Sequence, residues 1–168
     1  KVLNEKSKLG GLDPYSASKS SQDIISNSYK ESFFKKKINF SIVRAGNIIG
    51  GGDWNLSRLV PDIYNSIINK KKVVIRNPNA IRPWQHILGV IGAIILILLK
   101  NDKRLFITSQ IYNIGPNIKS NMRVIDLVKK IIKSSKYKNF KLTVNKIKFR
   151  ETKVLRLSNK LIKKELNW

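Results

Sequence analysis

The sequence predicts an α/β fold. Short runs rich in isoleucine and valine alternate with longer segments in which apolar residues recur every three or four positions. Glycine, proline and asparagine separate these segments, as is typical of turns. Apolar residues make up 42% of the 168 residues, enough for a packed core and too many for a disordered chain.

The first predicted helix begins at Asp13-Pro14, because aspartate suits the N-cap and proline suits the first helical position. Its apolar spacing continues to about Phe34. A buried strand over Phe40–Ala45 and a glycine-rich loop over 46–53 follow. The later predicted elements are a helix from Arg58 or Pro61 to Asn69, a strand Val73–Arg76, a helix His86–Lys100, a strand Ile111–Ile114, a helix from an Asn121 cap to Ser135, a strand Phe140–Val144 and a helix from a Ser158 cap to Trp168.

The net charge of +24 is the strongest compositional bias, and it suggests a nucleic-acid binder at first sight. The lysines, however, are spread from Lys1 to Lys164 in short runs of the kind found on solvated helix ends and turns. Isoleucine and asparagine are over-used with them, which indicates a biased genome. We therefore expect no nucleic-acid partner. The chain has no cysteine and a single histidine, His86, so we expect no metal site.

The longest apolar stretch, Ile87–Leu99, is shorter than the ~20 residues that a membrane-spanning helix needs. It therefore predicts a buried core helix. No leader-like pattern follows Lys1, which is not a methionine. We expect a cytoplasmic protein without a membrane partner.

Tyr15 and Lys19 lie four residues apart at a predicted helix start, so they share one face. An ammonium group beside a phenol favours the phenolate, which suits the tyrosine for general-base chemistry. The spacing alone is a weak signal in a lysine-rich chain, where a partly buried tyrosine beside a solvated lysine is the alternative. The segment Gly46–Gly52 has neither the G-x-G-x-x-G spacing of a dinucleotide site nor a P-loop lysine.

Several longer blocks occur in a fixed order. They are Leu9–Pro14 leading into Tyr15-Ser-Ala-Ser-Lys19, Arg44–Trp54 (RAGNIIGGGDW), Arg58-Leu-Val-Pro61, and Arg76–His86 (RNPNAIRPWQH). This order resembles the extended short-chain dehydrogenases and, more narrowly, the CDP-glucose 4,6-dehydratases of the NAD-dependent epimerase/dehydratase family. The resemblance runs from about Leu9 to Trp168.

The resemblance implies conversion of CDP-glucose to CDP-4-keto-6-deoxyglucose with tightly bound NAD, in deoxysugar and surface-polysaccharide biosynthesis. By resemblance, Tyr15 is the catalytic base and Lys19 holds the nicotinamide ribose. Ala45 joins these two residues as a cofactor-binding position. The implied substrate-binding residues are Asn47, Arg58, Leu59, Arg76, Asn77, Arg82 and Glu151. The tryptophans Trp54 and Trp84 are expected to pack, with a role as stacking platforms as the alternative. His86 is expected to make a structural hydrogen bond, and Tyr112–Pro116 to line the pocket.

The implied fold is the C-terminal part of a Rossmann-type parallel-sheet domain plus a small α/β substrate-binding region. Residues 1–50 are assigned to the NAD-binding domain, whose first half is missing. Residues 51–168 are assigned mainly to the substrate-binding region, with segments returning to the first domain. We expect a C-terminal piece of a longer enzyme that is a homodimer or homotetramer at full length, inactive alone and exposing apolar surface.

Two positions depart from the pattern, since Gly89 and Ser158 stand where the family usually has aspartate. The alternatives are another nucleotide-sugar epimerase or dehydratase, a non-catalytic basic binding protein, or a remnant without function.

Overall fold

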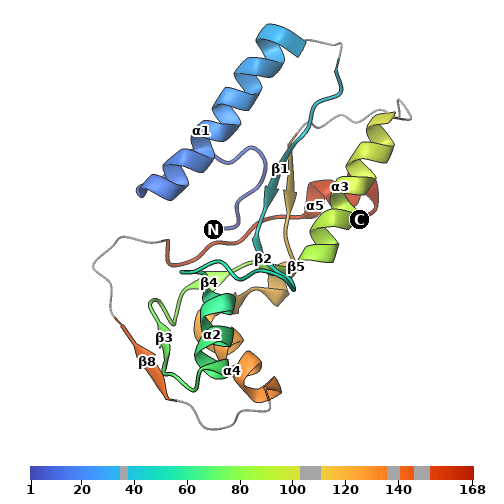
Figure 1. The fold of residues 1–168 in the computed structure, drawn as a ribbon. Helices are drawn as coiled ribbons and strands as arrows, with labels where there is room; N and C mark the ends of the chain where they lie inside the picture. The colour runs from blue at the N-terminus through green and yellow to red at the C-terminus, as the bar shows by residue number, and fades with distance from the viewer. Residues whose placement is uncertain (35–37, 103–110, 136–140, 146–151) are drawn as a thin grey trace.

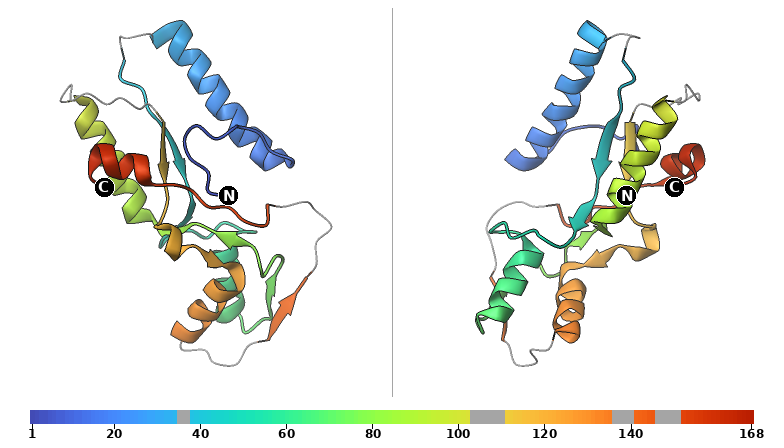
Figure 2. Two further views of the ribbon diagram at one scale, coloured as in Figure 1. Left: turned by 180° about the vertical axis from the view of Figure 1, so that it is seen from behind. Right: turned by 45° about the vertical axis from the view of Figure 1, so that its right-hand side comes forward.

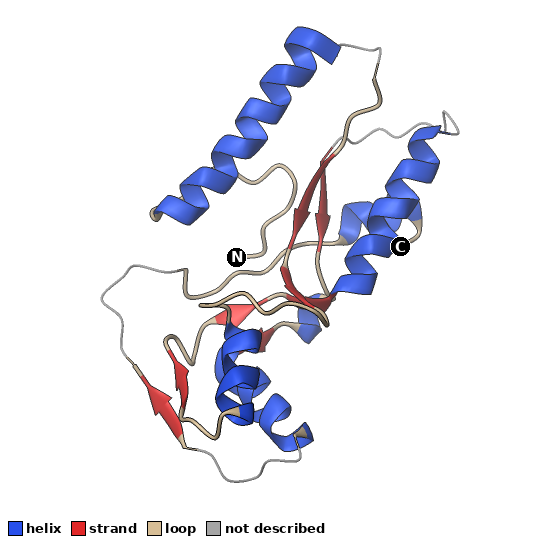
Figure 3. Cartoon of the chain, viewed as in Figure 1, coloured by secondary structure: helices blue, strands red, loops and turns tan. Residues whose placement is uncertain are grey.

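The computed structural model describes residues 1–34, 38–102, 111–135, 141–145 and 152–168, so the predicted site residue Glu151 lies outside the described part. The helices are α1 (Pro14–Tyr29), the π-helix η1 (Lys30–Phe34), α2 (Leu59–Ile68), α3 (Ile87–Asp102), the 3-10 helix η2 (Ile118–Ser120), α4 (Val124–Ser134) and α5 (Lys160–Leu166). The strands are β1 (Ile42–Ala45), β2 (Asn47–Ile49), β3 (Val73–Ile75), β4 (Ile81–Arg82), β5 (Trp84–His86), β6 (Ile111–Ile114), β7 (Met122–Arg123) and β8 (Leu142–Val144). The predicted α/β class is confirmed (Figures 1 and 3).

The strands associate in pairs. β1 pairs with β6, β2 with β5 and β3 with β8, all parallel, whereas β4 and β7 are antiparallel. In the longest pair, Ile42 lies opposite Ile111 and Ala45 opposite Ile114. Parallel pairing brings the carboxyl ends of β1 and β6 to one edge, where ligands of open α/β sheets bind.

The upper body consists of β1, β6, α1, α3 and α5. Helices α3 and α5 lie on one side of the β1–β6 pair and α1 lies on the other (Figures 1 and 2). The buried apolar cluster of this body joins β6 to α3 and α5, and its members are Val90, Ala93, Ile97, Tyr112, Ile114, Ile162 and Leu166. The Tyr112 hydroxyl donates to Glu165 Oε2 at 2.6 Å, and burial raises the pKa of this phenol. This bond joins β6 to α5.

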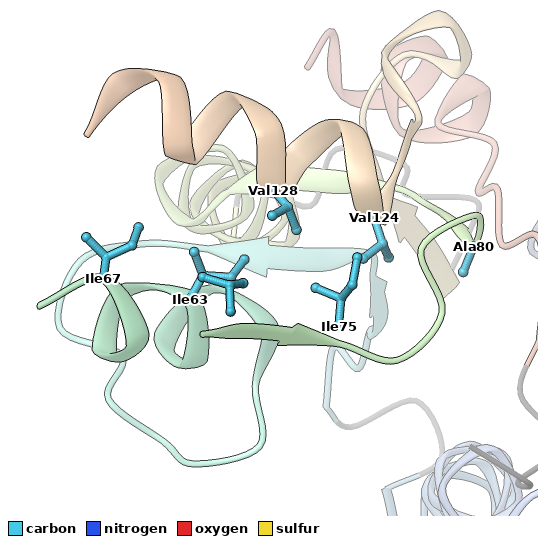
Figure 4. Packing of buried hydrophobic residues seen from close by; sticks show 7 residues of the cluster. Ile63, Ile67, Ile75, Ala80, Val124 and Val128 are labelled. Carbon is cyan, nitrogen blue, oxygen red and sulfur yellow. The ribbon is translucent and has the colours of Figure 1, made fainter. Parts of the chain in front are cut away.

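The lower body consists of α2, β3, α4 and β8. Val124 and Val128 of α4 point toward Ile63 of α2 and Ile75 of β3, as Figure 4 shows. These side chains are between 0 and 9% exposed, and Ile67, Val73 and Ala80 complete the cluster. The apolar spacing of α4 at i, i+3, i+4 and i+7 thus faces a core, as its periodicity predicted.

The two bodies meet where the chain leaves β1 and enters β2. The Gly46 N–H donates to the Ile114 carbonyl at 2.9 Å and the Asn47 N–H donates to the Pro83 carbonyl at 3.0 Å. A Cβ on Gly46 would lie 2.5 Å from the Pro83 oxygen, so only glycine permits this approach. Within two residues the chain therefore changes partner from β6 to β5.

Three local predictions were wrong. The segment predicted as a loop over 46–53 contains β2, because pairing with β5 makes a strand of Asn47–Ile49. Arg123, not Asn121, is the N-cap residue of α4, and its guanidinium binds Asp126. Asn159, not Ser158, is the N-cap residue of α5, although the Ser158 hydroxyl accepts from the Lys160 N–H at 3.4 Å.

Candidate functional site

The Tyr15 and Lys19 pair lies in the first turns of α1. Tyr15 is 71% exposed, and the Lys19 ammonium lies 5.7 Å from the centre of its ring while donating to Gln22 Oε1 at 3.2 Å. The partly buried tyrosine of the alternative interpretation is therefore excluded. The pair presents a phenol and an ammonium group together on an open helix face.

The start of α1 is fixed by its cap, as the sequence predicted. Asp13 accepts from the Ser16 N–H at 2.9 Å and from the Ser16 hydroxyl at 2.6 Å, and these hydrogen bonds hold the pKa of Asp13 below its ordinary value. The preceding turn folds back over the helix, since the Gly10 N–H donates to the Ser20 hydroxyl at 2.9 Å. Tyr15 therefore occupies a defined position.

An ion pair ties α1 to the sheet. Arg44 Nε donates to Asp23 Oδ2 at 2.6 Å, and Arg44 Nη1 donates to the Glu5 carbonyl at 3.0 Å. The two side chains are 20% and 12% exposed, so this contact is half-buried. Arg44 was predicted only as part of a motif and Asp23 was missed, because a pairing across 21 positions leaves no local signal. The contact joins the C-terminal half of α1 to β1.

Three predicted residues gather where the two bodies meet. Ala45 ends β1, Asn47 begins β2, and Arg82 lies in β4 directly before the proline that binds the Asn47 backbone. Arg82 is only 7% exposed, and its Nη1 donates to the Ile81 carbonyl at 3.0 Å. Buried cations in proteins are paired or bind anions. Asn47 and Arg82 thus both belong to the strands at the C-terminal end of β1, where the two bodies meet.

The other predicted residues lie on the lower body. Arg58 is the N-cap residue of α2 and its Nη1 donates to Asp53 Oδ2 at 2.9 Å, which holds the pKa of Asp53 below its ordinary value. Leu59 packs against the lower core. Arg76 follows β3 in a hollow that Leu56 and Lys71 also line, and Asn77 accepts from the Ala80 N–H through its carbonyl. The structure does not bring these side chains into contact with Tyr15.

Two of the remaining expectations are confirmed and one is wrong. Trp84 packs against the lower core and its Nε1 donates to the Met122 carbonyl at 3.2 Å. His86 Nδ1 accepts from the Leu88 N–H at 3.2 Å, which is a structural hydrogen bond at the start of α3. Trp54 does not pack, since it is 59% exposed.

In the described part of the chain, no three histidine, aspartate or glutamate side chains lie together in a way that could hold a metal ion. Among the described helices, none is long and apolar enough to cross a membrane. The predicted site residues are thus an exposed tyrosine–lysine pair on α1, Asn47 and Arg82 where the two bodies meet, and arginines on the lower body. This combination suits proton transfer on an anionic, polar substrate.

A sequence profile of the family described as GDP-mannose 4,6 dehydratase matches residues 1–168. The chain belongs to this family. It is 37% identical over 134 residues to the CDP-glucose 4,6-dehydratase of Salmonella typhimurium, an alignment that covers 76% of this chain and 37% of that protein. It is 34% identical over 134 residues to the dTDP-D-glucose 4,6-dehydratase of Dictyostelium discoideum, covering 79% of this chain and 28% of that protein.

Solved structures share the fold of this dehydratase family member. The dTDP-glucose 4,6-dehydratase of Bacillus anthracis in complex with NAD superposes with a TM-score of 0.78 at 22% identity, covering all of this chain and 50% of that chain. The UDP-glucuronic acid 4-epimerase of Bacillus cereus gives a TM-score of 0.79 at 17% identity, covering all of this chain and 51% of that chain. The chain therefore spans about half the length of these structures.

Gly89 and Ser158, the two positions that depart from the family pattern, each accept a hydrogen bond in the structure. The Trp168 Nε1 donates to the Gly89 carbonyl at 3.2 Å, so the C-terminal tryptophan docks on the first turn of α3. The Ser158 hydroxyl accepts from the Lys160 N–H at the start of α5, which is a contact that an aspartate could also make. Both positions lie at the α3–α5 side of the upper body, away from Tyr15 (Figure 1).

Proposed function

We propose that the chain is the substrate-binding and proton-transferring part of an NAD-dependent nucleotide-sugar 4,6-dehydratase that converts CDP-glucose to CDP-4-keto-6-deoxyglucose. The observation that carries the proposal is the exposed Tyr15–Lys19 pair, positioned by the Asp13 cap in a chain of this dehydratase family. The identity of 37% to a CDP-glucose 4,6-dehydratase supports the choice of nucleotide.

Tyr15 is proposed to take the proton from the 4-hydroxyl of the sugar through its phenol oxygen. Its exposure leaves the oxygen accessible, and the Lys19 ammonium places a positive charge 5.7 Å from the centre of the ring. NAD, when bound, supplies the hydride acceptor for the oxidation and the donor for the later reduction at C6. The side chains that would complete the elimination are not among those described.

Lys19 and Ala45 fit the nicotinamide end of NAD. Lys19 is proposed to hold the nicotinamide ribose beside Tyr15, and Ala45 to form the adjoining backbone surface. The pyrophosphate of NAD needs a glycine-rich turn at a helix N-terminus. Gly46–Gly52 does not have that spacing, and it contains β2 followed by a loop instead. Tight NAD binding is therefore proposed for a longer protein and not for these 168 residues alone.

The substrate contacts are proposed for the junction of the two bodies and for the lower body. Asn47 and Arg82 are proposed to bind the sugar nucleotide at the junction of the bodies, and Arg58 and Arg76 to bind its phosphates from the exposed face. Leu59, Asn77 and Glu151 stay predicted positions around them. Guanidinium groups suit this role because they bind phosphate oxygens in pairs.

A second candidate is a dehydratase for another nucleotide sugar. The 34% identity to a dTDP-D-glucose 4,6-dehydratase favours it, since the two relatives differ little in identity and in the share of the chain that they cover. The family, the tyrosine and the lysine serve both candidates equally. Turnover of CDP-glucose measured against dTDP-, GDP- and UDP-glucose separates them.

Association between copies is proposed through α1, as a homodimer or homotetramer of the full-length protein. Large apolar side chains on this helix stand exposed, including Ile24 at 59%, Ile25 at 56% and Phe33, in η1, at 70%. Such residues are typical of surfaces that another chain or segment covers.

The test is a chimera that joins the N-terminal part of the Salmonella typhimurium CDP-glucose 4,6-dehydratase to this chain. Replacing Tyr15 with Phe should lower turnover about 10²- to 10⁴-fold while CDP-glucose affinity stays unchanged, because only the proton acceptor is lost. Tyr29→Phe, on the same helix and also exposed, is the matched control and should keep full turnover. Full turnover by the Tyr15→Phe chimera would remove the proposed role.

A further inference from the structure

The three tryptophans of the chain differ in how far their indole rings are packed. Trp84 and Trp168 pack against the lower and upper cores, and each indole N–H donates to a backbone carbonyl at 3.2 Å. Trp54 is 59% exposed, and within the described ranges its indole has neither a hydrogen bond nor a ring partner. Packing therefore explains two of the three and leaves Trp54 without a structural role.

Trp54 lies in the β2–α2 loop, which we define as residues 50–58. Asp53 braces this loop by accepting from Asn55 N–H at 3.2 Å, from the Asn55 amide at 3.0 Å and from Arg58 at 2.9 Å. The Ser57 N–H donates to Asp62 Oδ1 at 3.1 Å and so ties the far end to α2. The exposed indole is thus presented by a loop that its neighbours hold in one conformation, as a preorganised binding surface requires.

Arginine and lysine side chains lie in and beside the β2–α2 loop. Arg58 belongs to the loop and pairs with Asp53, and Leu56 of the loop lines a hollow that Lys71, Arg76 and Asp62 also line. A Cβ on Gly51 or Gly52 would meet no atom within 4 Å, so the backbone beside Trp54 borders open space.

An aromatic face beside several cations matches the chemistry of a nucleoside diphosphate. The base offers a π-face for stacking and the diphosphate offers negative charge. Asn47, which begins the strand leading into this loop, is a predicted contact for the same nucleotide sugar. The loop therefore follows the predicted binding residue Asn47 closely in the sequence, and it contains a second predicted binding residue, Arg58.

We propose that the Trp54 indole stacks on the base of the nucleotide sugar and contributes to the recognition of its nucleoside part. This inference rests on the proposed function, since it assigns a base-binding residue to that substrate. It replaces the expectation that Trp54 packs in the core. The phosphates are bound by the neighbouring arginines and not by Trp54, so the base and the diphosphate have separable contacts.

The experiment measures binding of CDP and of inorganic pyrophosphate to the 168-residue chain by titration calorimetry. Trp54→Ala should weaken CDP binding about 5- to 150-fold, the range expected for the loss of one stacked base. Trp54→Phe should recover most of that loss, and pyrophosphate affinity should be unchanged in both variants. Tyr64→Ala is the matched control, since it removes an exposed aromatic side chain of α2, outside the loop, and should leave CDP binding intact.

Unchanged CDP affinity in Trp54→Ala would overturn the inference while leaving the proposed substrate standing. An equal loss for CDP and pyrophosphate would also overturn it, because the effect would then be a change in loop structure. Binding of a single-stranded oligonucleotide more tightly than CDP, with the same dependence on Trp54, would assign the indole to nucleic acid instead. Absence of any binding of CDP or CDP-glucose to the unaltered chain would contradict both the inference and the proposed substrate site.

Discussion

The lower body packs its helices α2 and α4 against each other and against β3, whereas α1 in the upper body buries none of its residues. Ile63 of α2 is 1% exposed and Ile25 of α1 is 56% exposed, although both are isoleucines on helices of the same chain. The lower body thus carries its own core. The position of α1 depends on a cap, a folded-back turn and one ion pair.

The outer face of α3 resembles α1 in this respect. Val90, Ala93 and Ile97 are buried against β6 and α5, while Leu88, Ile95 and Leu98 are between 50 and 68% exposed. A helix that is apolar on all sides is normally covered on all sides. The expectation that the chain exposes apolar surface is confirmed. Much of this surface lies on α1 and α3, and α2 and β3 of the lower body also expose Tyr64, Ile68 and Val74.

The largest difference between the two regions should appear in stability. Replacing Ile63 with Ala removes buried methyl groups and should lower the free energy of unfolding by about 2–5 kcal/mol. Replacing Ile25 with Ala should change it by less than about 0.5 kcal/mol, because the side chain is already exposed. Urea unfolding of the 168-residue chain measures both values, and similar losses for the two variants would contradict the comparison.

A smaller effect is expected for the ion pair that ties α1 to β1. Arg44→Met should leave Asp23 half-buried without its partner and lower stability by about 1–3 kcal/mol. Limited proteolysis should then cut within α1 before the lower body. The control is Arg123→Met, which breaks a more exposed pair with Asp126 and should change little. Equal resistance of α1 in both variants would show that the Arg44 contact does not hold the helix.

The smallest effect concerns pH. The pKa of Asp13 lies below its ordinary value of 3.8, so its capping contribution is complete above that value and is lost as pH falls through the lower, folded-state pKa. The helix signal by circular dichroism should decline in this range. Asp13→Asn keeps a capping oxygen and should abolish this part of the titration. A titration that is identical in the variant would assign the change to other carboxylates.

The sequence predicted most of the long elements because their signals are local. The Asp13-Pro14 start of α1, the parallel α/β class and the core helix beginning near His86 follow from caps, turn residues and apolar runs. The strands β2, β4 and β7 have two or three residues each, and no periodicity can reveal them. β2 forms because it pairs with β5, and β4 and β7 form because they pair with each other. At Gly46, the close contact with Pro83 fixes the point where the chain changes its strand partner.

In the candidate site, too, the residues that belong to local motifs were predicted and those that depend on distant contacts were not. Tyr15, Lys19 and the arginines follow from short motifs and from the order of longer blocks, and the family is confirmed. Their roles stay predictions. The Arg44–Asp23 pair and the free indole of Trp54 were missed, because the first joins distant segments and the second depends on what does not pack against it.

The central claim is that this chain carries the nucleotide-sugar site at the junction of the two bodies and in the β2–α2 loop. Amide hydrogen exchange of the 168-residue chain, with and without saturating CDP-glucose, tests it most directly. We expect slower exchange in residues 46–59 and 75–84 when the ligand is bound, and rapid exchange in both states in residues 21–34, which follow the Tyr15–Lys19 pair. Protection confined to other segments, or none at saturation, would contradict the claim.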